Sequence, residues 1–227
     1  MMTVLFVGFV GAILLMDRTP MANVMIGRPI VAGPVMGFVV GSPAEGLWVG
    51  ALFELFWIGA APIGAFLPPD DTLATCAAVG AYGLSRLDDP AALALVTILA
   101  VPLCGVGKAL DTRLRRSNID IVHWVDRRLD QGWPSAVERG HYFSLLGFAA
   151  MGSSLVVACT LAELIALKWI YYLLPDHARH GFAVLHVLLP ALGIASALTL
   201  GPPSRRLAWI SFGAFVGLAV AGTVRLL

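Results

Sequence analysis

Residues 28–71 read RPIVAGPVMGFVVGSPAEGLWVGALFELFWIGAAPIGAFLPPDD. The stretch is almost entirely apolar. A proline inside a helix removes a hydrogen bond and clashes with the preceding turn. In hydrocarbon, the freed backbone groups must be satisfied by protein or by a water-filled cavity. The pattern predicts discontinuous or re-entrant helices, which in transporters line a substrate site; ordinary loops between short helices are the alternative. The helix breakers are Pro29, Gly33, Pro34, Gly37, Gly41, Pro43, Gly59, Pro62, Gly64, Pro68 and Pro69.

The composition of the whole chain points to a membrane protein. Of the 227 residues, 59% are hydrophobic and 13% are charged, against about 25% charged in an average globular protein. Too few polar groups are present to cover a soluble protein of this length. We therefore expect an all-α polytopic membrane protein, and neither a disulfide scaffold nor a nucleic-acid binder. The three cysteines stand singly in apolar runs and are expected to be buried thiols.

About seven to eight hydrophobic segments follow one another along the chain. A segment needs about 20 apolar residues to cross the roughly 30 Å hydrocarbon core. The first, 4–16, is short for a full crossing; because Asp17 and Arg18 follow it, we expect it to be retained rather than cleaved as a signal peptide. The others are 26–41, 44–67, 72–84, 91–107, 143–164, 182–200 and 207–224.

A polar connection separates two hydrophobic halves. Twelve of the 29 charged residues lie between Lys108 and Arg139, which divides the chain into 1–107, 108–141 and 142–227. Residues 119–130, IDIVHWVDRRLD, favour an amphipathic helix in the membrane interface, or equally a solvated helical linker packed on its own protein. Because seven of its charges are cationic, we expect the connection to be cytoplasmic, with residues 175–180 and the C-terminus outside and Arg205 and Arg206 inside.

Three carboxylates of the interrupted stretch are candidate functional groups. Glu54 lies within WVGALFELFWIG with no cation within a helical turn. A charge at this depth is costly unless it faces a polar cavity or a partner, so we interpret it as functional, with a neutral structural glutamate as the alternative. Asp70 and Asp71 follow two prolines, and we expect one of them to cap the next helix. The other is expected to point into the cavity as a hydrogen-bond acceptor.

The remaining polar residues within the spans carry weaker signals. We place Glu163 and Lys168, which lie five residues apart, at the membrane interface, and we interpret His186 as structural. No phosphate-binding loop, metal-ligand cluster or nucleophile–base pair occurs in the sequence. We therefore expect no catalytic residues, no metal and no cofactor.

The order of four motifs resembles a known family. The motifs are DRT (17–19), GRPIVAGPVMGFVVG (27–41), GALFELFWIG (50–59) and PIGAFLPPD (62–70). Together they resemble the membrane subunit IIC of the mannose/fructose/sorbose-type sugar phosphotransferase system, closely over residues 17–78 and loosely to the end. The resemblance implies a bacterial inner-membrane sugar permease subunit. It also implies pairing with a second membrane subunit, IID, trimers of these pairs, and a cytoplasmic IIA/IIB phosphocarrier that phosphorylates a hexose-like sugar.

The resemblance also assigns roles to single residues. Glu54 and Asp70 match acidic positions of the family motifs, and Asn23 stands where many members have glutamine. Carboxylates and amides suit sugars, because hydroxyls need both donors and acceptors. The predicted substrate-binding set is therefore Glu54, Asp70, Asn23 and Asp71. The predicted structural or gating set is Asp17, Arg28, Pro29, Gly59, Gly64, Pro68 and Pro69.

The chain departs from the family pattern at three places. Ser42 stands where the family often has aspartate, Pro62 where asparagine is common, and the C-terminus looks about one helix short. These departures support an alternative function, a non-transporting membrane scaffold or sensor for phosphotransferase components.

Overall fold

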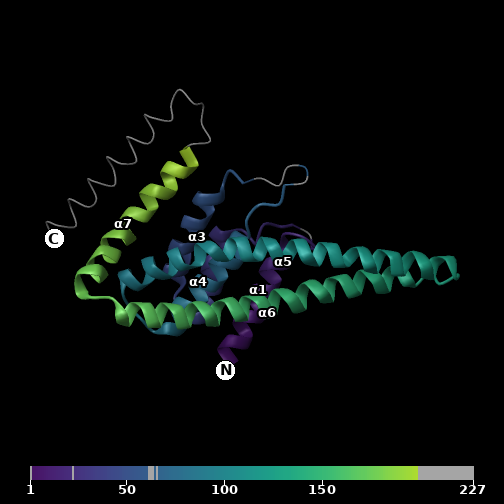
Figure 1. The fold of residues 1–227 in the computed structure, drawn as a ribbon, viewed down its shortest axis with the longest axis horizontal. Helices are drawn as coiled ribbons and strands as arrows, with labels where there is room; N and C mark the ends of the chain where they lie inside the picture. The colour runs from purple at the N-terminus through teal and green to yellow at the C-terminus, as the bar shows by residue number, and fades with distance from the viewer. Residues whose placement is uncertain (1, 22, 61–63, 65, 199–227) are drawn as a thin grey trace.

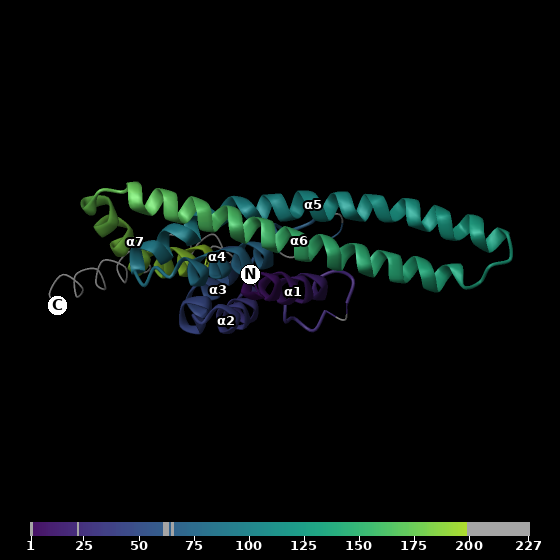
Figure 2. The same ribbon diagram turned by 90° about the horizontal axis from the view of Figure 1, so that it is seen from below.

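All the secondary-structure elements in the described part of the chain are helices. The computed structural model describes residues 2–21, 23–60, 64 and 66–198. The described helices are α1 (Met2–Asp17), α2 (Pro29–Val40), α3 (Pro43–Trp57), α4 (Asp71–Ser85), α5 (Pro90–Asp130), α6 (Ala136–Leu173) and α7 (Asp176–Leu198). Helices α5 and α6 run side by side along the long axis, and α1–α4 gather beside one part of them (Figures 1 and 2). The predicted all-α fold is confirmed.

Three described helices, α5, α6 and α7, are long and apolar enough to cross a membrane, and α1 and α2 are shorter apolar helices. Helix α7 turns back after α6 and packs on α3 and α5. The predicted segment 207–224 and the Arg205–Arg206 loop lie outside the described residues.

Helices α2 and α3 form a hairpin of two short pieces. They have 12 and 15 residues, and at 1.5 Å per residue each reaches only about 18 to 22 Å. Each begins with a proline, whose missing N–H would be unpaired at that position anyway. Helix α2 ends at Gly41, which has a φ of 83°. The predicted interruption of the helical path is thus confirmed, and it falls at Gly41 and Ser42.

Glycines bring the backbones of α2 and α3 into direct contact. A Cβ on Gly33 would lie 2.1 Å from the carbonyl oxygen of Gly46, and a Cβ on Gly50 would lie 2.2 Å from that of Pro29. Real Cβ atoms essentially never approach so closely. The close approach of the two helices therefore depends on the absence of side chains at these positions.

Helix α4 is the centre of the bundle. Every one of its residues except Leu84 is buried, and it contacts α1, α2, α3, α5 and α6. Its many small residues allow neighbours to pack closely on all sides. Because α4 begins at Asp71, the loop before it is held against the core.

The polar connection is not a separate element. Helix α5 continues through Lys108 to Asp130, and α6 begins at Ala136, so both helices cross the predicted division points at 107/108 and 141/142. The two helices extend together well beyond α1–α4 (Figure 1). The rings of Trp124 and Phe143 meet edge to face at 6.1 Å between centroids. These contacts match the alternative of a helical linker packed on its own protein.

Candidate functional site

Asp17 organises the loop between α1 and α2. It is the last residue of α1 and is 2% exposed. Its carboxylate accepts hydrogen bonds from the backbone N–H groups of Val24, at 2.8 Å, and Gly27, at 3.1 Å. Hydrogen bonds to a charged acceptor are among the strong ones in proteins. Asp17 therefore holds Val24 and Gly27 in place, within the loop that carries Arg18, Asn23 and Arg28.

Glu54 of α3 has a cationic partner that comes from another part of the chain. Its side chain, 15% exposed, is ion-paired with Arg28, which is 49% exposed and stands just before α2. It also accepts a 3.4 Å hydrogen bond from the N–H of Ile30 in the first turn of α2. A carboxylate is favourable at a helix N-terminus. Glu54 of α3 thus holds the beginning of α2.

Arg18 binds the beginning of α4. Its guanidinium donates to Asp71 and, at 3.2 Å, to the hydroxyl of Thr72, which in turn donates to the carbonyl of Gly27. It also lies 3.8 Å from the carboxylate of Asp70. The negative charges of Glu54 and Asp71 repel each other across this network. Two arginines from the loop before α2 therefore neutralise acids from three different segments.

Of Asp70 and Asp71, it is Asp70 that caps the N-terminus of α4. Its side chain accepts a hydrogen bond from the N–H of Leu73 at 3.0 Å, so the expected capping role falls to Asp70. Asp70 lies in the loop before α4. Burial raises its pKa to about 6, although the Arg18 charge and the Leu73 N–H both favour the ionised form. The carboxyl therefore changes charge close to neutral pH.

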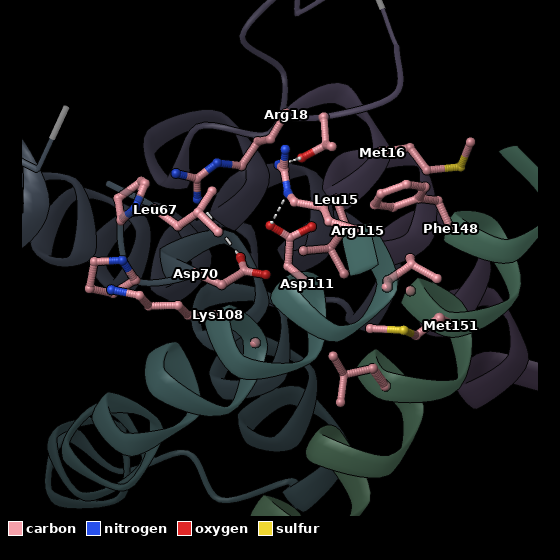
Figure 3. Close-up of a pocket in the computed structure, with 17 residues that line it drawn as sticks. Leu15, Met16, Arg18, Leu67, Asp70, Lys108, Asp111, Arg115, Phe148 and Met151 are labelled. Atoms are coloured by element: carbon pink, nitrogen blue, oxygen red, sulfur yellow. Dashed lines mark hydrogen bonds and ion pairs between the residues drawn. The ribbon is translucent and has the colours of Figure 1, made fainter. Parts of the chain in front are cut away.

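A cavity of about 130 Å³ opens beside Asp70. On this measure a single water needs about 10–15 Å³, so the cavity accommodates several waters or a small polar ligand. Arg115 crosses its wall and donates to Asp111 and to the hydroxyl of Thr19, each at 2.8 Å (Figure 3). The lining residues are Leu15, Met16, Arg18, Thr19, Leu67, Pro68, Pro69, Asp70, Gly107, Lys108, Asp111, Leu114, Arg115, Phe148, Met151, Gly152 and Leu155.

The cavity has a charged wall and an apolar wall. In Figure 3, Arg18, Asp70, Lys108 and Asp111 lie on one side, and Met16, Phe148 and Met151 on the other. A wall of donors and acceptors facing an apolar wall is the usual composition of a small-molecule site.

Gly107 allows the loop before α4 to press against α5. A Cβ at this position would lie 2.5 Å from the Cβ of Asp70 and 2.8 Å from one of its carboxylate oxygens. The N–H of Asp70 also donates to the carbonyl of Cys104 at 2.9 Å. The position of Asp70 in the cavity wall is therefore set by the surface of α5.

The predicted site residues divide into three groups. Of the predicted residues, only Asp70, Pro68 and Pro69 line the cavity. Glu54, Asp71 and Arg28 take part in the ion pairs, Asp17 binds backbone N–H groups of the loop before α2, and Pro29 is the first residue of α2. Asn23, Gly59 and Gly64 are exposed in loops, and within the described residues Asn23 has no hydrogen bond to the acids.

Sequence reasoning did not single out five polar residues that line the cavity. In the sequence, Arg18 and Thr19 stand in the DRT motif after the first hydrophobic segment. Lys108, Asp111 and Arg115 belong to the polar connection. The signal was the placement of the last three on one face of a helix, at spacings of three and four residues.

Comparison with known proteins gives the family and the fold. The sequence matches the family model described as "PTS system sorbose-specific iic component" over residues 1–226. A solved structure described as "Structure of membrane protein" has a TM-score of 0.71 at 20% identity, covering 100% of this chain and 94% of that one. The mannose transporter ManYZ in complex with microcin E492 has a TM-score of 0.63 at 21% identity, covering 99% and 93%. No curated protein sequence matches the chain.

At these identities the two structures establish a shared fold, and the family match covers nearly the whole sequence. The predicted resemblance is confirmed: the chain is a multi-pass membrane protein that belongs to the family of sorbose-specific IIC components of the phosphotransferase system (PTS).

Proposed function

We propose that this chain forms the sugar pathway of a phosphotransferase system in the bacterial inner membrane. The family places it among sugar-specific membrane subunits, which are transport components and not themselves catalytic. The observation that carries the proposal is the cavity at Asp70, reached by polar side chains from the loop after α1, the loop before α4 and α5. Phosphorylation of the sugar by a cytoplasmic IIB partner is the coupled step.

The sugar-binding residues of the proposal are Asp70 in the cavity wall, Asp71, which follows it in the chain, and Glu54 and Asn23, which do not line the cavity in this conformation. Neutral hydroxyls need both donors and acceptors, and the cavity offers carboxylates beside guanidinium groups. The residues Asp17, Arg28, Pro29, Gly59, Gly64, Pro68 and Pro69 have the structural or gating role. They shape the two loops that join α1 to α2 and α3 to α4.

The assembly we propose has this chain paired with a IID membrane subunit in a trimer of pairs. The projecting α5–α6 hairpin carries six arginines between residues 109 and 139 and lies on the cytoplasmic side by the rule that positive loops stay inside. A IIA/IIB phosphocarrier meets the complex on that side.

The test is uptake of labelled hexoses by cells that lack their own permease and express this chain with its IID and IIA/IIB partners. Glu54→Ala and Asp70→Ala are expected to abolish uptake at normal membrane levels of the protein. Glu138→Ala, which removes an exposed acid at the start of α6, is the matched control and keeps uptake. Uptake that survives both site substitutions refutes the site.

A scaffold or sensor role is the second candidate. It is favoured by one observation, that Glu54 and Asp71 already have arginine partners in the described conformation. Wild-type complexes that assemble with IID but take up none of the labelled hexoses would support a scaffold or sensor role and not a transport role.

A further inference from the structure

A second carboxyl lies inside the bundle, away from the cavity. Glu163 of α6 is 4% exposed and Thr160, one turn earlier, is fully buried. Glu163 is therefore enclosed by protein, and its position at the membrane interface stays a prediction. Lys168, its predicted companion, is on the exposed side of the same helix.

Glu163 lies well inside α6, one of the helices that are long and apolar enough to cross a membrane. It precedes the end of α6 at Leu173 by ten residues, which is about 15 Å along the axis. Leu155, the last α6 residue in the cavity wall, is eight residues away, or about 12 Å. Glu163 is thus separate from the proposed sugar site.

The polar atoms at this place find no hydrogen-bond partner among the described residues. Within the described chain, both carboxyl oxygens of Glu163 and the hydroxyl oxygen of Thr160 are buried without a hydrogen bond. Thr160 faces Gly80 of α4, where a Cβ would lie 2.9 Å from its methyl carbon. The two groups therefore lie on the buried face of α6.

The described part of the chain offers no compensating charge to Glu163. Helix α6 packs on α1, α4 and α5, and no charged side chain of the described residues acts on Glu163. The titratable group that interacts with it is the Cys159 thiol, which lies one turn earlier on α6. Other titratable groups on the elements around α6 are Asp17 at the end of α1, Asp71, Cys76 and Tyr82 on α4, Cys104 on α5, and the charged part of α5 from Lys108 onward. The cations of α5 all lie in that part, and none of them acts on Glu163.

A bare carboxylate in this setting is far more costly than a neutral acid, because its charge has lost water and gained no partner. A proton on one carboxyl oxygen removes the charge without any other ligand. We propose that Glu163 is a proton-binding site at the centre of the membrane-spanning bundle, and that it holds its proton at neutral pH in this conformation.

Infrared spectroscopy of the full chain in lipid bilayers tests the site directly. A protonated carboxyl without hydrogen bonds absorbs at the high-frequency end of the C=O region, away from carboxylates and amides. At neutral pH, the difference between wild type and Glu163→Gln is expected to show one such band, lost in the variant. Glu138→Gln, an exposed acid on the same helix, is the matched control and keeps the band.

Isotopic labelling makes the test independent of any variant. The chain has four glutamates, at positions 45, 54, 138 and 163. Glutamate labelled with ¹³C at the carboxyl carbon is expected to shift the protonated band of the wild-type protein. A wild-type spectrum with no protonated glutamate at neutral pH overturns the proposal, as does a band that Glu163→Gln leaves in place. Because this measurement needs no sugar, it can fail while the proposed transport function stands.

Discussion

Substitution of Gly33 by alanine tests whether direct backbone contact holds α2 on α3. The new Cβ would lie 2.1 Å from the carbonyl oxygen of Gly46, where real contacts start at 3.0 Å. The helices must therefore separate by about 0.9 Å, the difference between the two distances. Backbone cannot rotate away as a side chain can, so we expect a cost of about 3 kcal/mol, the upper range for overpacking.

Gly105→Ala is the matched control. Gly105 is also a helical glycine, on α5, and a Cβ there would meet nothing within 4 Å. Both substitutions gain about 1 kcal/mol of helix propensity, and only Gly33→Ala has the overlap. The two variants are thus expected to differ by about 3 kcal/mol, or about 6–12 °C in unfolding temperature for a chain of this size.

The assay is thermal unfolding in lipid nanodiscs followed by tryptophan fluorescence, since Trp48 and Trp57 lie on α3. Gly105→Ala is expected to match or exceed the wild type, and Gly33→Ala to fall well below it. Equal unfolding temperatures for the two variants, within about 2 °C, would refute the reasoning that glycine contact sets the distance between α2 and α3.

Three further predictions concern the ion-pair network and the cavity. Arg28→Met is expected to destabilise the protein by about 1–3 kcal/mol, because it leaves the largely buried Glu54 carboxylate unpaired; adding Glu54→Gln recovers part of the loss in a double-mutant cycle of thermal unfolding. Gly107→Ala is expected to push Asp70 from the cavity wall, which weakens sugar binding in calorimetry by more than about tenfold, or about 1.4 kcal/mol, while the matched Gly105→Ala binds normally. Since the pKa of Asp70 is raised to about 6, its acceptor form increases as pH rises through that value, so sugar affinity is expected to rise with pH around pH 6 and to become flat in Asp70→Asn.

Local sequence signals predicted the broken helices and the cap. Proline at the first position of α2 and α3 and glycine after α2 each act through the backbone of neighbouring residues, so the starts of both helices and the end of α2 follow from the sequence. A cap at Asp70 or Asp71 also follows from it, and the structure shows that Asp70 has this role, since its carboxylate accepts from an N–H only three residues away.

Local sequence signals could not predict ion pairs and hydrogen bonds between residues that are far apart in the sequence. Glu54 looked unpaired because Arg28 is 26 residues away, and only the folding of α2 onto α3 brings them together. Likewise Arg115 reaches Thr19 across 96 positions. The charges after Lys108 suggested the end of a span, but helix α5 continues because its polar part has no proline or glycine between Lys108 and Asp130 to stop it.

The hairpin of α5 and α6 is long enough for a small bend in α5 to displace its tip by several ångströms. Helix α5 has a proline at position 102, and prolines are common sites of helix bending. From there to Asp130 is 28 residues, or about 42 Å. A bend of about 10° at Pro102 therefore sweeps the tip through roughly 7 Å, because the displacement grows with the length of the arm. A movement of a fraction of an ångström beside the cavity would therefore displace the tip of the hairpin by more. A partner bound at the tip would be displaced with it.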